Sequence, residues 1–402
     1  MPESLAKSSL YQSLIEPQEK TQALGERAKS LFIGLPKELA ETENRICLTP
    51  DAVSVLVRNG HEVVVEKGAG EASHFSDQEY SEAGASIAYS PDKVFEANII
   101  LKVNPPTEQE LALCKPGSTI FSAVQFTNQK RAYFEGLVNK KMTAVAFESL
   151  QDKVGNFPIV RAMSEIAGSM SILIASEYLS GGQGTLLGGL DGIPPTSVVI
   201  IGAGTVGEFA ARTAIGLGAD IKVFDMHLYR LQRLRYTLGQ HIYTSIIDSQ
   251  NLAGALRNAD VVVAGLRAEK GFSPMVVTEE MVKQMKENAV VVDVAIDQGG
   301  CVETSELTTH RRPTFTKHGV IHYAVPNIAS RVGKTASQSL SNIFTPIFLK
   351  MGRLGGVDEM ILSNQWFLKG VYAFKGNITH QHIARKFDLR HRDLRLLLAA
   401  RI

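Results

Sequence analysis

The amino-acid sequence predicts an α/β protein built from two doubly wound, Rossmann-like domains joined by two long helices. Three observations support this fold class. Short β-branched strands alternate with helix-forming segments from residue 31 onward, as in parallel sheets. A glycine-rich turn, Gly202 to Gly207, links one such strand directly to a helix. Two helical patterns, near residues 163–179 and 334–351, are long enough to run between separate domains.

Length and composition set the broad class of protein. The 402 residues favour two domains, and the net charge of +1 gives no overall field that would attract nucleic acid or an anionic membrane. No apolar run reaches the roughly 18 residues of a membrane span, and the polar N-terminus has no signal-peptide core. The cysteines Cys47, Cys114 and Cys301 form no metal-ligand or disulfide pattern. We therefore expect a cytoplasmic protein with no metal, no nucleic-acid partner and no direct membrane insertion.

The predicted domain organisation starts with an extension, residues 1–30, of mixed polarity. Residues 31–160 and 335–402 form a discontinuous substrate domain, and residues 161–334 form the cofactor domain. This division follows from the two long helical patterns, which would carry the chain into the second domain and back. A hinge between the two lobes is expected at these helices.

The substrate domain is predicted to hold a parallel sheet without a nucleotide-binding glycine motif. The expected strands cover residues 30–36, 61–66, 99–103, 119–124 and 143–148. A helix over 51–59 follows Thr49, which we expect to be its N-cap, and Pro50, a favoured first helical residue. The basic tail from residue 378 is expected to pack as an amphipathic terminal helix.

The cofactor domain is predicted from a G-x-G-x-x-G motif that follows a strand and opens a helix. The first glycine of this motif permits the tight turn, the second lets a pyrophosphate approach the backbone, and the third lets the helix pack on the strand. The helix N-terminus then offers free N–H groups to the phosphates. The motif consists of Gly202, Ala203, Gly204, Thr205, Val206 and Gly207.

An acid at the end of the next strand favours NAD as the cofactor. Asp225 lies 23 residues after Gly202 (225 − 202), close to the spacing of about 20 that the dinucleotide fold requires. Its carboxylate would accept the ribose hydroxyls and repel a 2′-phosphate. Arg230 and Arg233 lie near enough to leave NADP open, and a glycine turn without any nucleotide is the simpler alternative.

A second acidic motif follows the buried strand predicted over residues 289–297. Asp297 is expected to end this strand, at the edge where open α/β sheets bind ligands. It could orient an attacking water or hydrogen-bond a substrate nitrogen. Asp293 is expected to point the same way from the strand, and we rank it as structural.

Together these motifs resemble those of alanine dehydrogenases and of the soluble NAD-binding component of proton-translocating transhydrogenase, over about residues 31–350. The form Ile-Asp-Gln-Gly-Gly-Cys is the most specific, and it is similar to the dehydrogenase branch. The motifs are Glu38 with Arg45-x-x-x-Thr49-Pro50, Lys102 in Ile-Leu-Lys-Val, Met163-Ser164-Glu165-Ile166-Ala167-Gly168, the glycine turn, and residues 292–301.

The resemblance implies a reaction and a set of roles. The reaction is the NAD-dependent oxidative deamination of L-alanine, or a similar small amino acid, to pyruvate (a 2-oxo acid) and ammonium. Arg45 would grip the substrate carboxylate, and Lys102 would contact the carbonyl side. The residues around NAD or its nicotinamide would be Ser164, Asp225, Leu266, Asp297 and Asn327. Family members form homo-oligomers, which are hexamers in the dehydrogenase branch.

The residues themselves leave simpler roles open for both cations. Arg45 is also placed to form an ion pair with Glu38 or Glu43, and Lys102 could be a strand-end lysine that reaches solvent.

One position departs from the family pattern. Gln125 stands where alanine dehydrogenases carry a catalytic histidine, and the loop after Leu266 also differs. Glutamine cannot exchange a proton near neutral pH, and loss of a general acid or base typically costs about 10² to 10⁴ in rate. Other histidines, among them His310, are expected to be surface or packing residues.

Three hypotheses follow from this departure. The chain could be an amino-acid dehydrogenase with altered proton chemistry, a transhydrogenase-like NAD(H) carrier that serves an NADP-binding partner, or an NAD-binding relative that catalyses nothing. We adopt the first, because Arg45, Lys102 and Asp297 accompany the nucleotide motif.

Overall fold

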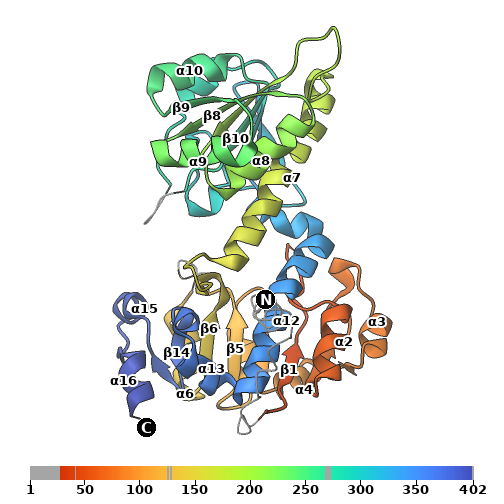
Figure 1. Cartoon of the computed structure of the whole chain (residues 1–402), viewed down its shortest axis with the longest axis vertical. Coiled ribbons are helices and arrows are strands. Elements are labelled where there is room, and N and C mark those ends of the chain that lie inside the picture. Colours follow the sequence, from red (N-terminus) through yellow and green to blue (C-terminus); the bar gives the residue numbers. More distant parts are fainter. Residues whose placement is uncertain (1–27, 41, 125, 127–128, 268–272, 401–402) are drawn as a thin grey trace, which may run out of the picture.

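The protein consists of two α/β domains that lie end to end and are connected by two long helices (Figure 1). The structure is a computed structural model that describes residues 28–40, 42–124, 126, 129–267 and 273–400. The connecting helices are α7 (Pro158–Gln183) and α12 (Gly333–Leu354). The predicted fold class is confirmed, and both helices are longer than predicted. Proline at the first position and Gly184 in a left-handed C-cap delimit α7.

The first domain is organised around an eight-stranded sheet in the order β15-β14-β6-β5-β4-β1-β2-β3. Strands β1 to β6 pair in parallel, and β14 and β15 add an antiparallel edge next to β6. The strands are β1 (Phe32–Leu35), β2 (Glu62–Glu66), β3 (Ser86–Ala88), β4 (Ile99–Leu101), β5 (Thr119–Ser122), β6 (Thr143–Ala146), β14 (Val371–Phe374) and β15 (Asn377–Ile378).

Helices cover both faces of this sheet, and buried side chains fill the two layers between them. On one face the ring of Phe121 on β5 meets that of Phe348 on α12, with centroids 5.4 Å apart. The α-helices of this domain are α2 (Pro50–Arg58), α3 (Asp77–Glu82), α4 (Pro91–Phe95), α5 (Glu108–Leu113), α6 (Arg131–Asn139), α13 (Val357–Ser363), α14 (Gln365–Leu368), α15 (Gln381–Lys386) and α16 (Leu394–Ala399).

One local prediction for this domain is confirmed and another is wrong. Thr49 is the N-cap of α2 and Pro50 its first residue, as expected, although the Thr49 hydroxyl forms no capping bond and pairs with Ser341 of α12 at 3.1 Å. The tail is not one helix, because α15 and α16 are separate and Asp388, between them, adopts a left-handed backbone (φ 51°). Asp393 then starts α16 by capping the N–H of Arg395 at 2.7 Å.

The second domain holds a seven-stranded sheet in the order β12-β13-β11-β10-β7-β8-β9. Its strands pair in parallel except β12, which is antiparallel to β13. The strands are β7 (Ser197–Ile201), β8 (Asp220–Asp225), β9 (Tyr243–Ile246), β10 (Val261–Ala264), β11 (Val290–Asp293), β12 (Thr314–Lys317) and β13 (Val320–Tyr323). The α-helices of this domain are α8 (Thr205–Gly216), α9 (Leu228–Leu238), α10 (Ser249–Arg257) and α11 (Glu279–Val282).

The apolar run at 289–297 is not a single strand as predicted. Strand β11 ends at Asp293, whose Oδ1 accepts the N–H of Ala295 at 3.1 Å. Asp297 therefore lies in a 3₁₀ turn, η3 (Ile296–Gln298), rather than at a strand end. Gly299 and Gly300 follow with positive φ angles of 93° and 70° and complete the turn. Residues two or four apart point to the same side only within a strand, so Asp293 and Asp297 do not share a direction across this turn.

Helix α7 is long and apolar enough to cross a membrane by length and composition, and it is the one such helix in the described part of the chain. Here α7 packs against α8, and a Cβ at Gly168 would collide with the carbonyl of Val206. The helix therefore serves as the connection between the two domains.

Candidate functional site

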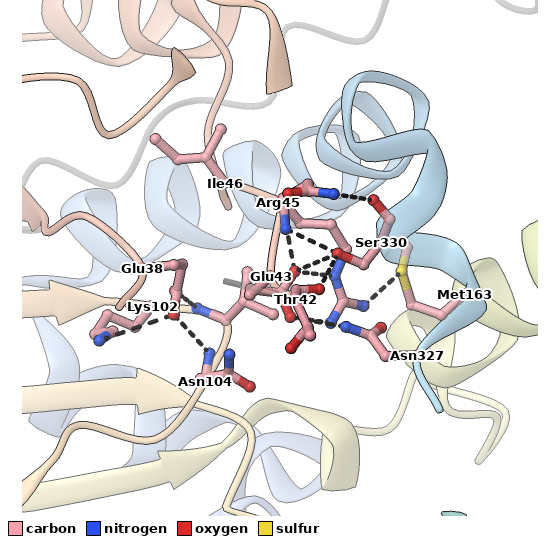
Figure 2. A network of polar contacts seen from close by, with 12 residues as sticks. Glu38, Thr42, Glu43, Arg45, Ile46, Lys102, Asn104, Met163, Asn327 and Ser330 are labelled. Carbon is pink, nitrogen blue, oxygen red and sulfur yellow. Dashed lines mark hydrogen bonds and ion pairs between the residues drawn. The ribbon is translucent and has the colours of Figure 1, made fainter. Parts of the chain in front are cut away.

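The two predicted substrate-binding cations lie at the same edge of the first sheet. Strands β1 and β4 are parallel neighbours, with Ile33 opposite Ile99, so the segments that follow them meet. Arg45 comes from the loop after β1, and Lys102 directly follows β4. Figure 2 shows both side chains within one network of polar contacts.

Arg45 forms a buried ion pair with Glu43, which was the alternative that the sequence left open. Its Nε and NH2 donate to Oε1 and Oε2 of Glu43 at 2.7 Å each, and NH1 lies 3.4 Å from Sδ of Met163. The Arg45 side chain is 11% exposed. A guanidinium has five N–H groups, so two remain for a ligand carboxylate.

Lys102 is not a lysine that reaches solvent, because its side chain is 2% exposed and ends in an ion pair. Its Nζ lies 2.6 Å from Oε1 of Glu110 and 3.8 Å from Oε2 of Glu38. Glu110 is itself held in a capping box at the start of α5, where its Oε2 accepts the N–H of Thr107 at 2.7 Å. The ammonium group is therefore fixed in place.

Glu38 joins the loop after β1 to the end of β4. Its Oε1 accepts the N–H of Val103 at 2.6 Å, and its Oε2 lies 3.4 Å from the N–H of Asn104. Burial raises the pKa of Glu38 to about 7, although the charge of Lys102 and these backbone bonds act in the opposite direction. The Glu38 carboxyl can therefore change its charge near neutral pH.

The network continues into the second domain through the segment after β13. Nδ2 of Asn327 donates to Oε2 of Glu43 at 2.9 Å, and Oγ of Ser330 donates to the carbonyl of Thr42 at 2.8 Å. Asn327 adopts a left-handed backbone (φ 63°), a conformation that asparagine tolerates. Asn327, expected beside the nicotinamide, thus contacts the carboxylate that holds Arg45.

The glycine turn has the local geometry that a pyrophosphate requires. Gly202 has φ 105°, and a Cβ at Gly207 would collide with the carbonyl of Gly202. At Gly204, by contrast, no described atom lies within 4 Å of where a Cβ would stand. Thr205 and Val206 form the first turn of α8. The backbone at Gly204 is therefore open to a ligand at a helix N-terminus, which fits the phosphates of a dinucleotide.

Asp225 fixes the backbone of this turn by hydrogen bonds. Its fully buried carboxylate accepts the N–H groups of Ala203 at 2.7 Å and His227 at 2.8 Å. Arg233 donates to the carbonyl of Ala203 at 3.0 Å. Leu266 is buried beyond the end of β10. In this structure Asp225 shapes the turn, and its two oxygens face backbone amides.

Within the described part of the chain, no hydrogen bond or ion pair joins Ser164, Asp293 or Asp297 to the charged network. Ser164 is half-buried on α7. Asp297 is exposed on its 3₁₀ turn, yet desolvation by the surrounding protein raises its pKa against the opposing charge of Arg267. Asp293 is fully buried, and burial raises its pKa to about 6. Gln125 lies outside the described residues.

Glu110 holds Lys102, a role that was not assigned from the sequence although the Thr107-x-x-Glu110 spacing was a signal for it. Glu43 holds Arg45, which was one of the two ion pairs that the sequence left open. His310 has a buried Nε2 with no hydrogen-bond partner among the described residues. Burial lowers its pKa. The described residues form no group of three His, Cys, Asp or Glu that could hold a metal ion, and Cys47, Cys114 and Cys301 are free and buried.

Comparisons with known proteins assign the chain to a family. Residues 34–167 match the family described as alanine dehydrogenase/PNT, N-terminal domain, and residues 171–381 match its C-terminal domain. Alanine dehydrogenase 2 of Staphylococcus aureus is 37% identical over 366 residues, which is 90% of this chain and 98% of the relative.

Two solved structures have the same arrangement. An L-alanine dehydrogenase superposes with a TM-score of 0.84 at 34% identity, covering 89% of this chain and 99% of that one. A transhydrogenase from Sinorhizobium meliloti has a TM-score of 0.75 at 24% identity, covering 87% and 99%, and shares the fold. The chain therefore belongs to the alanine dehydrogenase/PNT family and is an alanine dehydrogenase-like oxidoreductase.

Proposed function

We propose that this protein is an NAD-dependent dehydrogenase that interconverts L-alanine, or a similar small amino acid, with the corresponding 2-oxo acid and ammonium. The observation that carries the proposal is that Arg45 and Lys102 are buried at one sheet edge, each in its own ion pair, and that Glu43, the partner of Arg45, is hydrogen-bonded to the cofactor domain. The names of the relatives agree with this substrate class.

Each cation has a task in this reaction. The two free N–H groups of Arg45 would bind the substrate carboxylate. Lys102, fixed by Glu110, would stabilise the negative charge that develops on the carbonyl or carbinolamine oxygen. Asp297, from the second domain, would orient water or the substrate nitrogen. Its raised pKa supports a role in proton exchange.

For the cofactor, we propose NAD bound at the glycine turn. When bound, NAD accepts or returns a hydride. Gly204 would admit the pyrophosphate, and the carboxylate of Asp225, at the end of β8, disfavours a 2′-phosphate through its charge. Ser164, Leu266 and Asn327 would line the nicotinamide end. Arg230 and Arg233 keep NADP as the competing cofactor to be measured.

The experiment that tests the reaction is NADH oxidation with pyruvate and ammonium across pH, for the native chain and for Gln125→His. Turnover by the native chain would establish the dehydrogenase and show that a group other than residue 125 exchanges the proton. Activity in Gln125→His alone would indicate a site that lacks its acid or base. If neither protein oxidises NADH although both bind it, the proposal is contradicted. A transhydrogenase-like NAD(H) carrier or a non-catalytic NAD-binding relative is then favoured.

We also propose that the protein is a cytoplasmic homo-oligomer, with a hexamer as the expected state. Large apolar side chains exposed on the segment after α7 support self-association: Leu186, Leu190 and Ile193 are 63%, 57% and 61% exposed. Light scattering coupled to gel filtration measures the oligomeric state, and a monomer at micromolar concentration would contradict this part.

A further inference from the structure

Five buried ionisable side chains form a single cluster at the substrate edge of the first domain. Arg45 and Lys102 supply two positive charges, and Glu38, Glu43 and Glu110 supply three carboxyl groups. None of these side chains is more than 11% exposed. Charges in such surroundings are poorly screened, so the sum of charges in the cluster matters.

Two of the three carboxylates are matched by a close cation. Glu43 contacts Arg45 at 2.7 Å, and Glu110 contacts Lys102 at 2.6 Å. Glu38 is the third, and it has only a longer ion pair, of 3.8 Å, to the same Lys102. With all five groups ionised the cluster carries one net negative charge (two positive, three negative) before any substrate arrives.

A substrate carboxylate would add a second negative charge to this cluster. We propose that Glu38 takes up one proton from solvent when the carboxylate of the 2-oxo acid or amino acid binds beside Arg45 and Lys102. The proton neutralises the one carboxyl group that has no close cation of its own, so the cluster keeps the same net charge with and without substrate. This inference rests on the proposed function, because it requires an anionic substrate at this edge.

The charged groups around Glu38 favour protonation of Glu38 as the way in which the negative charge of the substrate is offset. Lys102 approaches from β4, and Glu43 and Arg45 belong to the same loop as Glu38. Cys47 also lies near, but burial raises the pKa of its thiol far above neutral, so it stays uncharged. The pKa of Glu38 is already about 7. Another anion nearby raises it further, since like charges disfavour ionisation.

Calorimetry tests the proposal without turnover. The protein saturated with NADH is titrated with oxamate, an unreactive analogue of pyruvate, in two buffers of different ionisation enthalpy at pH 6, 7 and 8. The difference in heat gives the protons taken up per oxamate bound. For a free pKa of about 7 and a Glu38 that is fully protonated in the complex, uptake rises from about 0.1 proton at pH 6 to about 0.9 at pH 8.

Variants of Glu38 test whether the proton binds to this carboxyl group. Glu38→Gln should take up less than about 0.2 proton at every pH, whereas Glu66→Gln should behave as the native chain. Glu66 is a matched control because burial also raises its pKa, it accepts a backbone bond from Lys37, and it senses the charges of Glu110 and Lys102 without forming an ion pair with Lys102. If Glu38→Gln fails to fold or to bind NADH, Glu38→Asp is used, and its uptake should have a shifted pH midpoint. Native-like uptake in Glu38→Gln, or an unchanged midpoint in Glu38→Asp, would overturn the proposal.

Different results would contradict the role of Glu38 and the proposed function. A native chain that oxidises NADH with pyruvate and ammonium, and binds oxamate with no proton uptake, overturns the role of Glu38 and leaves the proposed function intact. A native chain that neither turns over nor binds oxamate overturns both.

Discussion

The side-chain amide of Asn327 donates a hydrogen bond to Oε2 of Glu43 at 2.9 Å, and that same oxygen accepts NH2 of Arg45 at 2.7 Å. Asn327 belongs to the second domain and Glu43 to the first. The orientation of the arginine proposed to bind substrate therefore depends on how the two domains meet. Contacts of this kind give an enzyme a route by which cofactor binding can influence substrate binding.

Replacing Asn327 by aspartate should weaken substrate binding. Aspartate tolerates the same left-handed backbone, but its carboxylate would face that of Glu43. We expect a loss of about 1–3 kcal/mol in unfolding free energy, the cost of leaving a buried polar group without its hydrogen bond, and a higher KM for pyruvate. Urea unfolding and initial rates measure both. Asn288→Asp, at another left-handed asparagine (φ 58°), is the control, and equal effects of the two changes would contradict the role of Asn327.

Alanine at two glycines of the nucleotide turn should have opposite consequences. Gly204→Ala adds a methyl group to open space, with φ −77° already suitable for alanine, so folding should be unchanged. NADH affinity should fall at least about tenfold, or 1.4 kcal/mol, because the methyl group occupies the place proposed for the pyrophosphate. Gly207→Ala collides with the backbone at Gly202 and should impair folding. NADH fluorescence and thermal unfolding distinguish these outcomes, and native affinity in Gly204→Ala would refute the placement.

Removing the charge of Lys102 should affect stability and chemistry separately. Lys102→Met leaves Glu110 buried without its cation, which costs about 3–5 kcal/mol. Adding Glu110→Gln removes the uncompensated charge, so the double variant should regain most of the stability. It should not regain turnover if Lys102 stabilises the reacting oxygen. Denaturant unfolding and rate measurements on both variants provide the comparison; a double variant with native turnover would exclude Lys102 from the chemistry.

The stability of the protein should depend on Glu38 in a defined pH window. The pKa of Glu38 is about 7 in the folded chain against an ordinary value of 4.5, so the folded state binds this proton more tightly. The resulting stabilisation is complete below pH 4.5 and is lost as the pH rises to about 7, with a slope of at most about 1.4 kcal/mol per pH unit.

Glu38→Gln should remove that slope. The measurement is the difference in unfolding free energy between native protein and variant from pH 4.5 to 8. Asp293, whose pKa is also raised, contributes with the same sign in both proteins and cancels. A constant difference across the window would show that Glu38 does not titrate there.

Features encoded in short segments were predictable from the sequence. The glycine turn between β7 and α8 follows from glycine spacing, because the tight turn and the close packing are local requirements. Lys102 at the end of β4 follows from an apolar run that stops. The run at 289–297 was predicted wrongly for the same reason, since Ala295, which precedes the 3₁₀ turn, and Ile296, which begins it, are buried and as apolar as strand residues.

Contacts between distant segments were not predictable in this way. Glu43 and Asn327 are 284 residues apart, and their hydrogen bond depends on the packing of two domains. The sequence left two roles open for Arg45, binding the substrate carboxylate or forming an ion pair. One guanidinium has enough N–H groups for both. The hydroxyl of Thr49, at the predicted N-cap, makes no capping bond because Ser341, 292 residues further along the chain, offers a competing partner.

The antiparallel pairing of β14 with β6 has a consequence for how the chain acquires its shape during synthesis. A chain that leaves the ribosome in order has released β6 (Thr143–Ala146) and the whole second domain before Val371–Phe374 emerges. Until then β6 presents an uncovered hydrogen-bonding edge, with Ala144 and Val145 lacking the neighbour that finally shields them. The newborn protein is thus prone to aggregate with its neighbours until Val371–Phe374 emerges, and a premature stop before Val371 would make that vulnerable state permanent.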